Sequence, residues 1–164
     1  MKKIWAKWKP YILSILLALA VGGLASFLTR GEMKLYESGI IRKPPLSPPG
    51  WLFGVVWTIL YVLMGISAAT VYVRRQENPP LATDALTVYG VSLAVNFAWT
   101  ILFFKCRAFL FAFLWLLLLW GLICAVIVLF KKLRPAAGYL QIPYLLWVTF
   151  AGYLNFAVWL LNRA

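Results

Sequence analysis

Long stretches without charge dominate this sequence. Five intervals lack Lys, Arg, Asp and Glu, and each is at least 20 residues long. An α-helix rises 1.5 Å per residue, so roughly 20 apolar residues cross the hydrocarbon layer of a membrane. The intervals therefore predict five transmembrane helices, at approximately 10–29, 50–73, 84–104, 108–130 and 137–161.

The composition agrees with a membrane environment. The chain is 64% hydrophobic and 12% charged, whereas a soluble domain is about half apolar and about a quarter charged. The connections between the five intervals are short, and none is long enough to separate two domains. The sequence predicts an all-α membrane protein in which residues 1–164 form a single bundle of five transmembrane helices.

The first interval has an alternative interpretation as a secretory signal peptide, because basic residues precede it. Its apolar part is long for such a peptide, and "ASFLTRGEMK" offers a poor cleavage site. We therefore treat the interval as a membrane span.

The charge distribution indicates a membrane partner and not a nucleic acid. The net charge is +12, but the sixteen Lys and Arg residues are spread over all the predicted helix ends. Anchors beside anionic lipid headgroups have this distribution. Nine basic residues lie at the N-terminus and in the second and fourth loops, and seven lie on the other side. The positive-inside rule thus favours a cytoplasmic N-terminus by a small margin.

Several kinds of chemistry lack the residues they need. The sequence contains no histidine, which excludes imidazole ligands and histidine proton transfer. The two cysteines, Cys106 and Cys124, do not form a CxxC pair. All the acidic residues lie outside or at the edge of the spans: Glu32, Glu37, Glu77 and Asp84. We therefore expect no metal site, no cofactor and no carboxylate for ion coupling at membrane depth.

Three of the predicted helices carry aromatic faces. Side chains spaced three or four residues apart share one side of a helix. The candidate ligand-binding residues on these faces are Trp57, Tyr61, Asn96, Trp99, Tyr144, Trp147, Ala151 and Asn155. Helix packing and the interfacial aromatic belt are the alternative explanation. For Asn96 and Asn155, hydrogen bonding between helices stays open beside ligand contact.

Proline and small residues supply further expectations. Pro143 interrupts the fifth interval, where it predicts either a packing kink or a pocket wall. Residues Ala18, Gly22 and Ser26, and separately Gly90 and Ala94, have the small-xxx-small spacing that allows close helix contact. We expect a homodimer on this basis.

The segment "KPPLSPP" precedes the second predicted span. Proline fixes φ and restricts the residue before it. The segment therefore predicts a stiff, extended strap that ends in a helix start near Pro49, within a first loop over residues 30–49. We expect this loop to act as a pocket lid, with a plain helix-start signal as the alternative. The expected lid residues are Pro44, Pro45, Leu46, Pro48 and Pro49.

Three motifs, in order, carry a family resemblance: "KPPLSPPGWLFGVVWTILYVLMGISA", "NFAWTILFF" and "PYLLWVTFAGYLNFAVW". They resemble the TspO/MBR family, which includes bacterial tryptophan-rich sensory proteins and the translocator protein, also called the peripheral benzodiazepine receptor. The resemblance implies a five-helix bundle, often dimeric, that binds tetrapyrroles such as protoporphyrin IX. For a bacterial member it implies the cell membrane.

The resemblance leaves three functions open. The first is a tetrapyrrole-binding or sensory protein, the second a transporter of porphyrins or other hydrophobic ligands, and the third a light-dependent porphyrin-degrading enzyme. In the third case the resemblance implies catalytic roles for Trp57 and Trp147. The chain departs from the family pattern at Leu46, where a loop tryptophan is common, and at Phe156, where animal members have a tyrosine associated with sterols.

Overall fold

The computed structural model describes residues 2–163, and these residues form helices and no strand. Five helices are long and apolar enough to cross a membrane, which confirms the predicted all-α, five-helix bundle. A five-residue π-helix, η1, continues α3, and the short helix α5 precedes the last span. The bounds are α1 Lys2–Glu37, α2 Gly50–Val73, α3 Pro79–Thr100, η1 Ile101–Lys105, α4 Phe109–Leu133, α5 Pro135–Tyr139 and α6 Ile142–Asn162.

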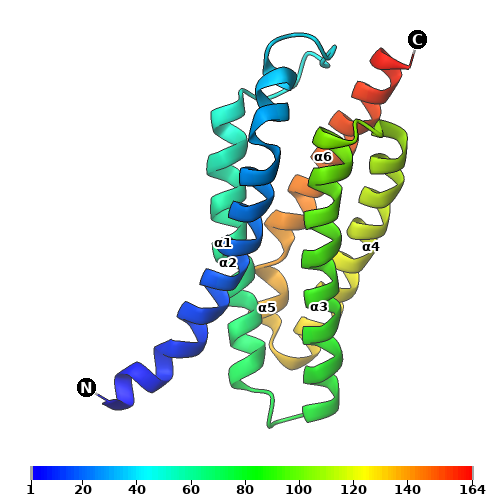
Figure 1. The fold of residues 1–164 in the computed structure, drawn as a ribbon. Helices are drawn as coiled ribbons and strands as arrows, with labels where there is room; N and C mark the ends of the chain where they lie inside the picture. The colour runs from blue at the N-terminus through cyan, green and yellow to red at the C-terminus, as the bar shows by residue number, and fades with distance from the viewer. Residues whose placement is uncertain (1, 164) are drawn as a thin grey trace.

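The bundle consists of two groups of helices. Helices α1 and α2 pack along each other as an antiparallel hairpin, while α4 packs against both α3 and α6. The contact between the hairpin and the other group is divided over several smaller helix pairings, mainly of α1 with α3 and η1 and of α2 with α3 and α5. The loop between α1 and α2, the α3–α4 connection and the C-terminus share one end of the molecule, and the N-terminus lies at the other (Figure 1). We call the end of the molecule that holds the α1–α2 loop the loop end.

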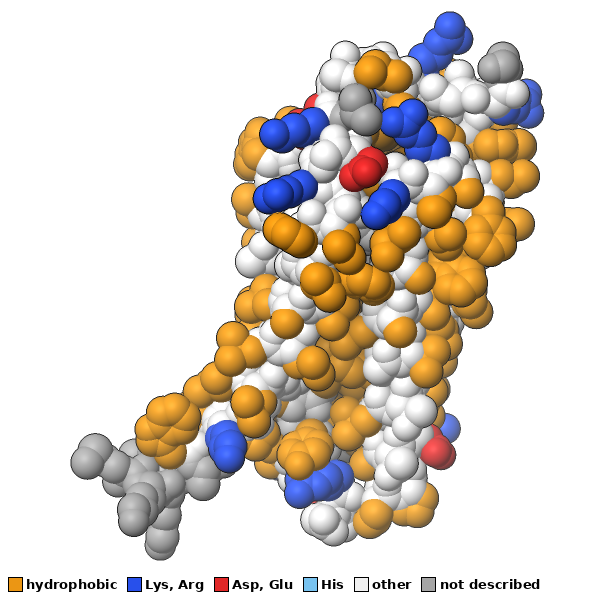
Figure 2. Space-filling view, in the orientation of Figure 1, with side chains coloured by type: hydrophobic (Ala, Val, Ile, Leu, Met, Phe, Trp, Pro, Cys, Tyr) orange, Lys and Arg blue, Asp and Glu red, His pale blue; other side chains and the backbone are white. Residues whose placement is uncertain are grey.

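The surface has the pattern of a protein that crosses a bilayer. Lys and Arg side chains gather at the two ends of the visible face, with hydrophobic side chains over the middle (Figure 2). Large apolar residues such as Leu17 and Leu146 are highly exposed, at 60% and 64%. In water such exposure would be unfavourable, at about 25 cal/mol per Å² of apolar surface. The chain is an integral membrane protein.

Helix α1 is longer than the charge pattern predicts. The first loop was expected over residues 30–49, but α1 continues to Glu37 and the loop covers only residues 38–49. Charged side chains mark where a helix leaves the hydrocarbon layer and do not by themselves end it. The helix ends where Gly39 adopts a φ of +86°, a left-handed conformation that glycine adopts without strain and that is common just after a helix.

Helix α3 begins at Pro79, five residues before the predicted start. The Asn78 side chain accepts a hydrogen bond from the backbone N–H of Leu81 at 3.3 Å. Prolines fill the first turn, where their missing N–H groups leave no bond unmade. These signals start the helix earlier, so Asp84, expected at the start of the span, lies inside α3.

The fifth predicted span is divided into two helices. Pro143 does not kink the interior of a helix, because it lies in the first turn of α6. The alternative expectation, a pocket wall, is met, since Pro143 lines an outer groove between α2 and α6. A buried polar group holds the break between α5 and α6. Gln141 donates to Ser67 Oγ at 3.0 Å, and Ser67 donates to the carbonyl of Ala137 at 2.7 Å. These bonds join the break to α2 and satisfy polar atoms that lipid could not.

Candidate ligand-binding site

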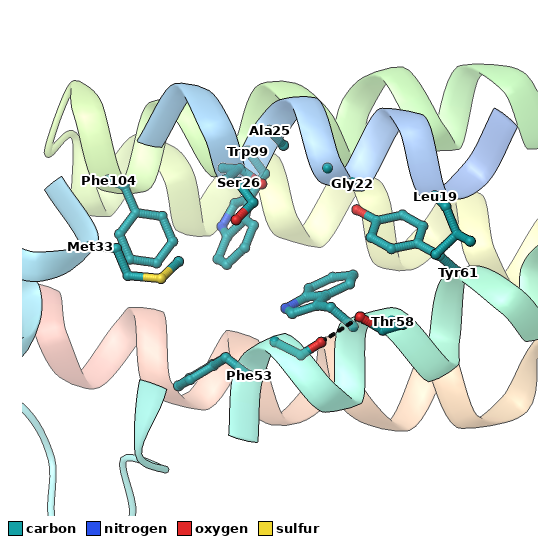
Figure 3. A pocket seen from close by; sticks show the side chains of 14 residues that line it. Leu19, Gly22, Ala25, Ser26, Met33, Phe53, Thr58, Tyr61, Trp99 and Phe104 are labelled. Carbon is teal, nitrogen blue, oxygen red and sulfur yellow. Dashed lines mark hydrogen bonds between the residues drawn. The ribbon is translucent and has the colours of Figure 1, made fainter. Parts of the chain in front are cut away.

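A cavity of about 270 Å³ lies between α1, α2 and α3 in the half of the bundle nearer the loop end. We call it the main cavity. Figure 3 shows side chains from these helices directed toward the same space. Its lining is Leu19, Gly22, Gly23, Ala25, Ser26, Met33, Phe53, Gly54, Trp57, Thr58, Tyr61, Trp99, Thr100 and Phe104.

The α2 wall is a ladder of aromatic rings. Phe53, Trp57 and Tyr61 follow one another at intervals of four residues, which places them on one side of the helix. Trp57 stacks on Tyr61 with ring centroids 5.6 Å apart and planes 30° apart. This wall offers an aromatic surface to a flat guest.

Two buried amides fix the orientation of two cavity rings, Tyr61 on α2 and Trp99 on α3. Asn96 Nδ2 donates to the hydroxyl of Tyr61 at 2.8 Å. Asn155 Oδ1 accepts from Trp99 Nε1 at 3.1 Å, and Asn155 Nδ2 donates to the carbonyl of Phe109 at 2.8 Å. Both asparagines are 1% exposed, so their hydrogen bonds between helices are the role that the structure shows.

The π-helix η1 places two consecutive aromatic residues in different positions. Phe103 is buried and stacks on Trp99, with centroids 5.5 Å apart and planes 27° apart. Phe104 lines the main cavity. A π-helix makes i to i+5 hydrogen bonds and is frequent at functional sites. Because it changes the angular step along the helix, η1 decides which ring enters the cavity.

A second cavity, of about 240 Å³, lies between the main cavity and the first loop. We call it the loop-end cavity. Met33, Phe53 and Phe104 line both cavities, so these side chains separate them. The rest of its lining is Tyr36, Glu37, Lys43, Pro48, Pro49 and Gly50. Burial raises the pKa of Tyr36 above its ordinary value of 10.0, which keeps its hydroxyl protonated and neutral at physiological pH.

The loop-end cavity carries charge of both signs. Lys43 Nζ lies over the Tyr36 ring, 5.2 Å from its centroid. The Glu37 carboxylate lies against Gly50, the first residue of α2. A helix N-terminus attracts negative charge, and no side chain caps α2 at Pro49. Glu37 therefore lies where its charge is favourable, and Lys43 is left available to a bound anion.

The proline-rich strap differs in part from expectation. Pro49 is extended, with φ −65° and ψ 149°, and α2 starts directly after it as predicted. The strap is not extended throughout, because Ser47 N–H donates to the carbonyl of Pro44 at 3.0 Å and closes a turn. Of the expected lid residues, Pro48 and Pro49 line the loop-end cavity, while Leu46 is 65% exposed.

The first loop is fastened to the last helix at Arg42, the residue directly before the strap. The side chain of Asn162 accepts from the backbone N–H of Arg42 at 3.0 Å and donates to its carbonyl at 2.9 Å. The loop is therefore held at the C-terminal end of α6.

The structure separates the predicted site residues into groups. Trp57, Tyr61 and Trp99 line the main cavity, with Asn96 behind Tyr61. Ala151 and Asn155 line a small hollow of about 20 Å³ that shares Phe53, Trp99 and Phe104 with the larger space.

The remaining two predicted residues lie on α6 and do not line the main cavity. Tyr144 is fully buried, and its ring edge meets Trp57 with centroids 6.1 Å apart. Trp147 meets Phe53 edge-on at 5.7 Å and lines an outer groove between α2 and α6. The two candidate catalytic tryptophans, Trp57 and Trp147, therefore do not share one cavity.

Sequence reasoning missed the contribution of α1. Leu19, Gly22, Gly23, Ser26 and Met33 line the main cavity. The small-xxx-small pattern on α1 was a usable signal, because Gly22 packs directly against the ring of Tyr61. This pattern serves contact within the chain. Phe104 gave no signal, because the π-helix that places it there has no pattern in the sequence.

Comparison with known proteins identifies relatives over most of the chain. The model of the TspO/MBR family matches residues 14–160. Protein CrtK of Rhodobacter capsulatus is 45% identical over 77% of this chain and 78% of its own length. The translocator protein of Bos taurus is 35% identical over 95% of this chain and 92% of its own length. The tryptophan-rich protein TspO of Chlorobaculum tepidum is 35% identical over 92% of this chain and 94% of its own length.

Proposed function

The chain belongs to the TspO/MBR family, and we propose that it is a membrane protein that binds planar tetrapyrroles of the protoporphyrin IX type. The observation that supports this most directly is the stacked pair Trp57 and Tyr61 facing Trp99 across an apolar cavity. Flat aromatic guests gain about 0.5–1.5 kcal/mol from each favourable ring pair beyond the burial of area.

The arrangement of the two cavities suits a guest with an apolar body and an acidic edge. The main cavity contains no charged residue, whereas Lys43 lines the loop-end cavity. A porphyrin with its ring beside Trp57 would direct its propionates toward Lys43. The partition by Phe53 and Phe104 would have to open, since ligand pockets for molecules of this size usually hold about 300–1,000 Å³.

A second candidate function is light-dependent porphyrin degradation, which the position of Trp57 on the main cavity favours. An indole beside an excited porphyrin is placed to relay an electron from the porphyrin to dioxygen, so that the porphyrin is oxidised, dioxygen is reduced and the indole is regenerated. The structure gives Trp147 a less direct part, because its ring lies in the outer groove. Turnover of more than one equivalent of porphyrin per protein under illumination, lost in Trp57→Phe, would support this function.

We also propose a bacterial cell membrane with a cytoplasmic N-terminus, and a homodimer formed through α3. Gly90 and Ala94 are exposed on the outside of the bundle, and a Cβ at Gly90 would meet no atom within 4 Å. This small-residue pair is free to meet a second copy, whereas Gly22 on α1 is occupied by Tyr61.

The test is a titration of purified protein in lipid nanodiscs with protoporphyrin IX, followed by porphyrin absorbance. We expect saturable binding of one porphyrin per chain. Trp57→Leu should weaken affinity roughly two- to tenfold, the equivalent of one ring pair. Trp147→Leu is the matched control and should change it little. Absence of saturable binding by the unaltered protein would refute the proposal.

A further inference from the structure

The main cavity is open on the side where α1 meets α2. Four of its lining residues are exposed on the outside of the bundle: Gly23 and Ser26 on α1, and Gly54 and Thr58 on α2. We call these four residues the lateral window. All of them are small, and they lie beside the larger inward-facing side chains of the same helices.

Glycine creates this opening. A Cβ built on Gly23 or Gly54 would meet no atom within 4 Å. Farther from the loop end the same two helices are in tight contact, because a Cβ at Gly65 would lie 2.5 Å from the Cα of Ile15. Gly22 is likewise filled by the Tyr61 ring. The α1–α2 interface is therefore closed below the cavity and open beside it.

The lateral window faces the hydrocarbon layer. Apolar side chains next to it point outward on both helices, including Phe27, 59% exposed, and Ile59, 55% exposed. The Thr58 hydroxyl donates to the carbonyl of Gly54 at 2.8 Å, so its donor is already used within the helix (Figure 3). Thr58 therefore presents no unpaired donor to an apolar molecule, and the Ser26 hydroxyl is the polar side-chain group left at this rim.

The alternative route, from water at the loop end through the loop-end cavity, is more obstructed than the lateral window. Phe53, Phe104 and Met33 stand between the loop-end cavity and the main cavity. The strap above them is fastened by the two hydrogen bonds between Arg42 and Asn162. Passage from this end requires ring rotation and the release of the strap. Passage through the lateral window requires neither.

We infer that the lateral window is the site where a planar, membrane-dissolved ligand enters and leaves the main cavity. This inference rests on the proposed function, because it concerns the same ligand and cavity. A flat macrocycle would enter edge-first between the glycines, after partitioning into the bilayer. Its body would then slide along the rings of Trp57 and Tyr61.

The test uses Gly54→Phe, which places a ring in the lateral window, and Gly121→Phe as its control. Gly121 is also an exposed glycine in a membrane helix with no atom within 4 Å of a Cβ, but it lies on α4. Protein in nanodiscs is mixed with vesicles that carry protoporphyrin IX, and association is followed by stopped-flow tryptophan quenching. Dissociation is followed after addition of excess empty vesicles.

We expect Gly54→Phe to slow both association and dissociation roughly tenfold, an added barrier of about 1.4 kcal/mol, while Kd changes much less. Gly121→Phe should match the unaltered protein. Unchanged rates in Gly54→Phe would overturn the inference.

If the phenylalanine abolishes equilibrium binding by filling the cavity, the smaller substitution Gly54→Ala tests the entry site instead. It must slow both rates by the same factor, and unaltered rates would again overturn the inference. Binding by the unaltered protein separates the two proposals. Its absence refutes the proposed function, whereas its presence with unaffected Gly54 variants refutes only the entry site.

Discussion

Asn155 on α6 holds the indole of Trp99 on α3 through a hydrogen bond of 3.1 Å from Nε1 to Oδ1. The other end of the same amide donates to the carbonyl of Phe109 at the start of α4. One buried side chain thus joins three helices and sets the angle of a ring on the main cavity. The fold and the site depend on the same contact.

Replacement of Asn155 with leucine should therefore destabilise the bundle and weaken binding together. The substitution leaves the Trp99 N–H and the Phe109 carbonyl without partners, at a cost of about 1–3 kcal/mol. Unfolding by a denaturing detergent should show a lower midpoint, and porphyrin affinity should fall. An unchanged midpoint would show that the amide contributes nothing to packing. Asn162→Leu, which releases the strap and not the core, should leave the unfolding midpoint closer to that of the unaltered protein.

Two buried tyrosines should respond in opposite ways to loss of their hydroxyls. The Tyr61 hydroxyl accepts from Asn96, whereas the Tyr144 hydroxyl is buried without a hydrogen-bond partner among the residues that the structure describes. Tyr61→Phe should destabilise by about 1–2 kcal/mol, because it leaves a buried amide donor unpaired. Tyr144→Phe should be neutral or stabilising, since it removes an unmet polar group. Equal destabilisation in both variants, measured by the same detergent unfolding, would contradict this difference.

The contact of Gly65 on α2 with Ile15 on α1 should be intolerant of a larger side chain. A Cβ at Gly65 would lie 2.5 Å from the Cα and 2.8 Å from the backbone nitrogen of Ile15. Backbone cannot move aside as a flexible side chain can, so Gly65→Leu should destabilise by about 1–3 kcal/mol or more. Thermal unfolding in nanodiscs, with Gly121→Leu as the exposed-glycine control, measures the effect. Equal unfolding temperatures for the two variants would show that α1 and α2 can separate enough to accommodate the larger side chain without loss of stability.

Lys43 should contribute to the affinity for acidic tetrapyrroles alone. Its ammonium lines the loop-end cavity, and an exposed charge pair contributes up to about 1 kcal/mol. Lys43→Gln should weaken binding of protoporphyrin IX by up to roughly fivefold and leave binding of its dimethyl ester unchanged. The control is Lys105→Gln, at the same end of the molecule but outside the described cavities. An equal loss for acid and ester would show that Lys43 acts through the shape of the loop.

Much of the fold could be predicted from local signals. Charge-free intervals locate the membrane spans because lipid excludes charge along the whole length of a helix. Helix ends were harder to predict, because they depend on backbone conformation. Gly39 ends α1 well beyond Arg30, the first charged residue after the first apolar interval. The Asn78 cap starts α3 ahead of Asp84, the last charged residue before the third interval. At Pro143 the same residue type that predicts a kink begins a new helix.

The aromatic faces of α2, α3 and α6 were determined by the sequence itself, since the spacing of side chains around a helix is a local property. Only the tertiary structure decided which faces share a cavity. It brought Trp57 and Trp99 together, assigned Trp147 to an outer groove, and made α1 the opposite wall. Helix packing depends on contacts between distant residues, such as Gly65 with Ile15 and Gly22 with Tyr61, and on the π-helix that positions Phe104. A spacing within one helix, such as that of the small residues around Gly22, can mark a face for close contact. It does not identify the partner residue, because each contact exists only when two helices meet.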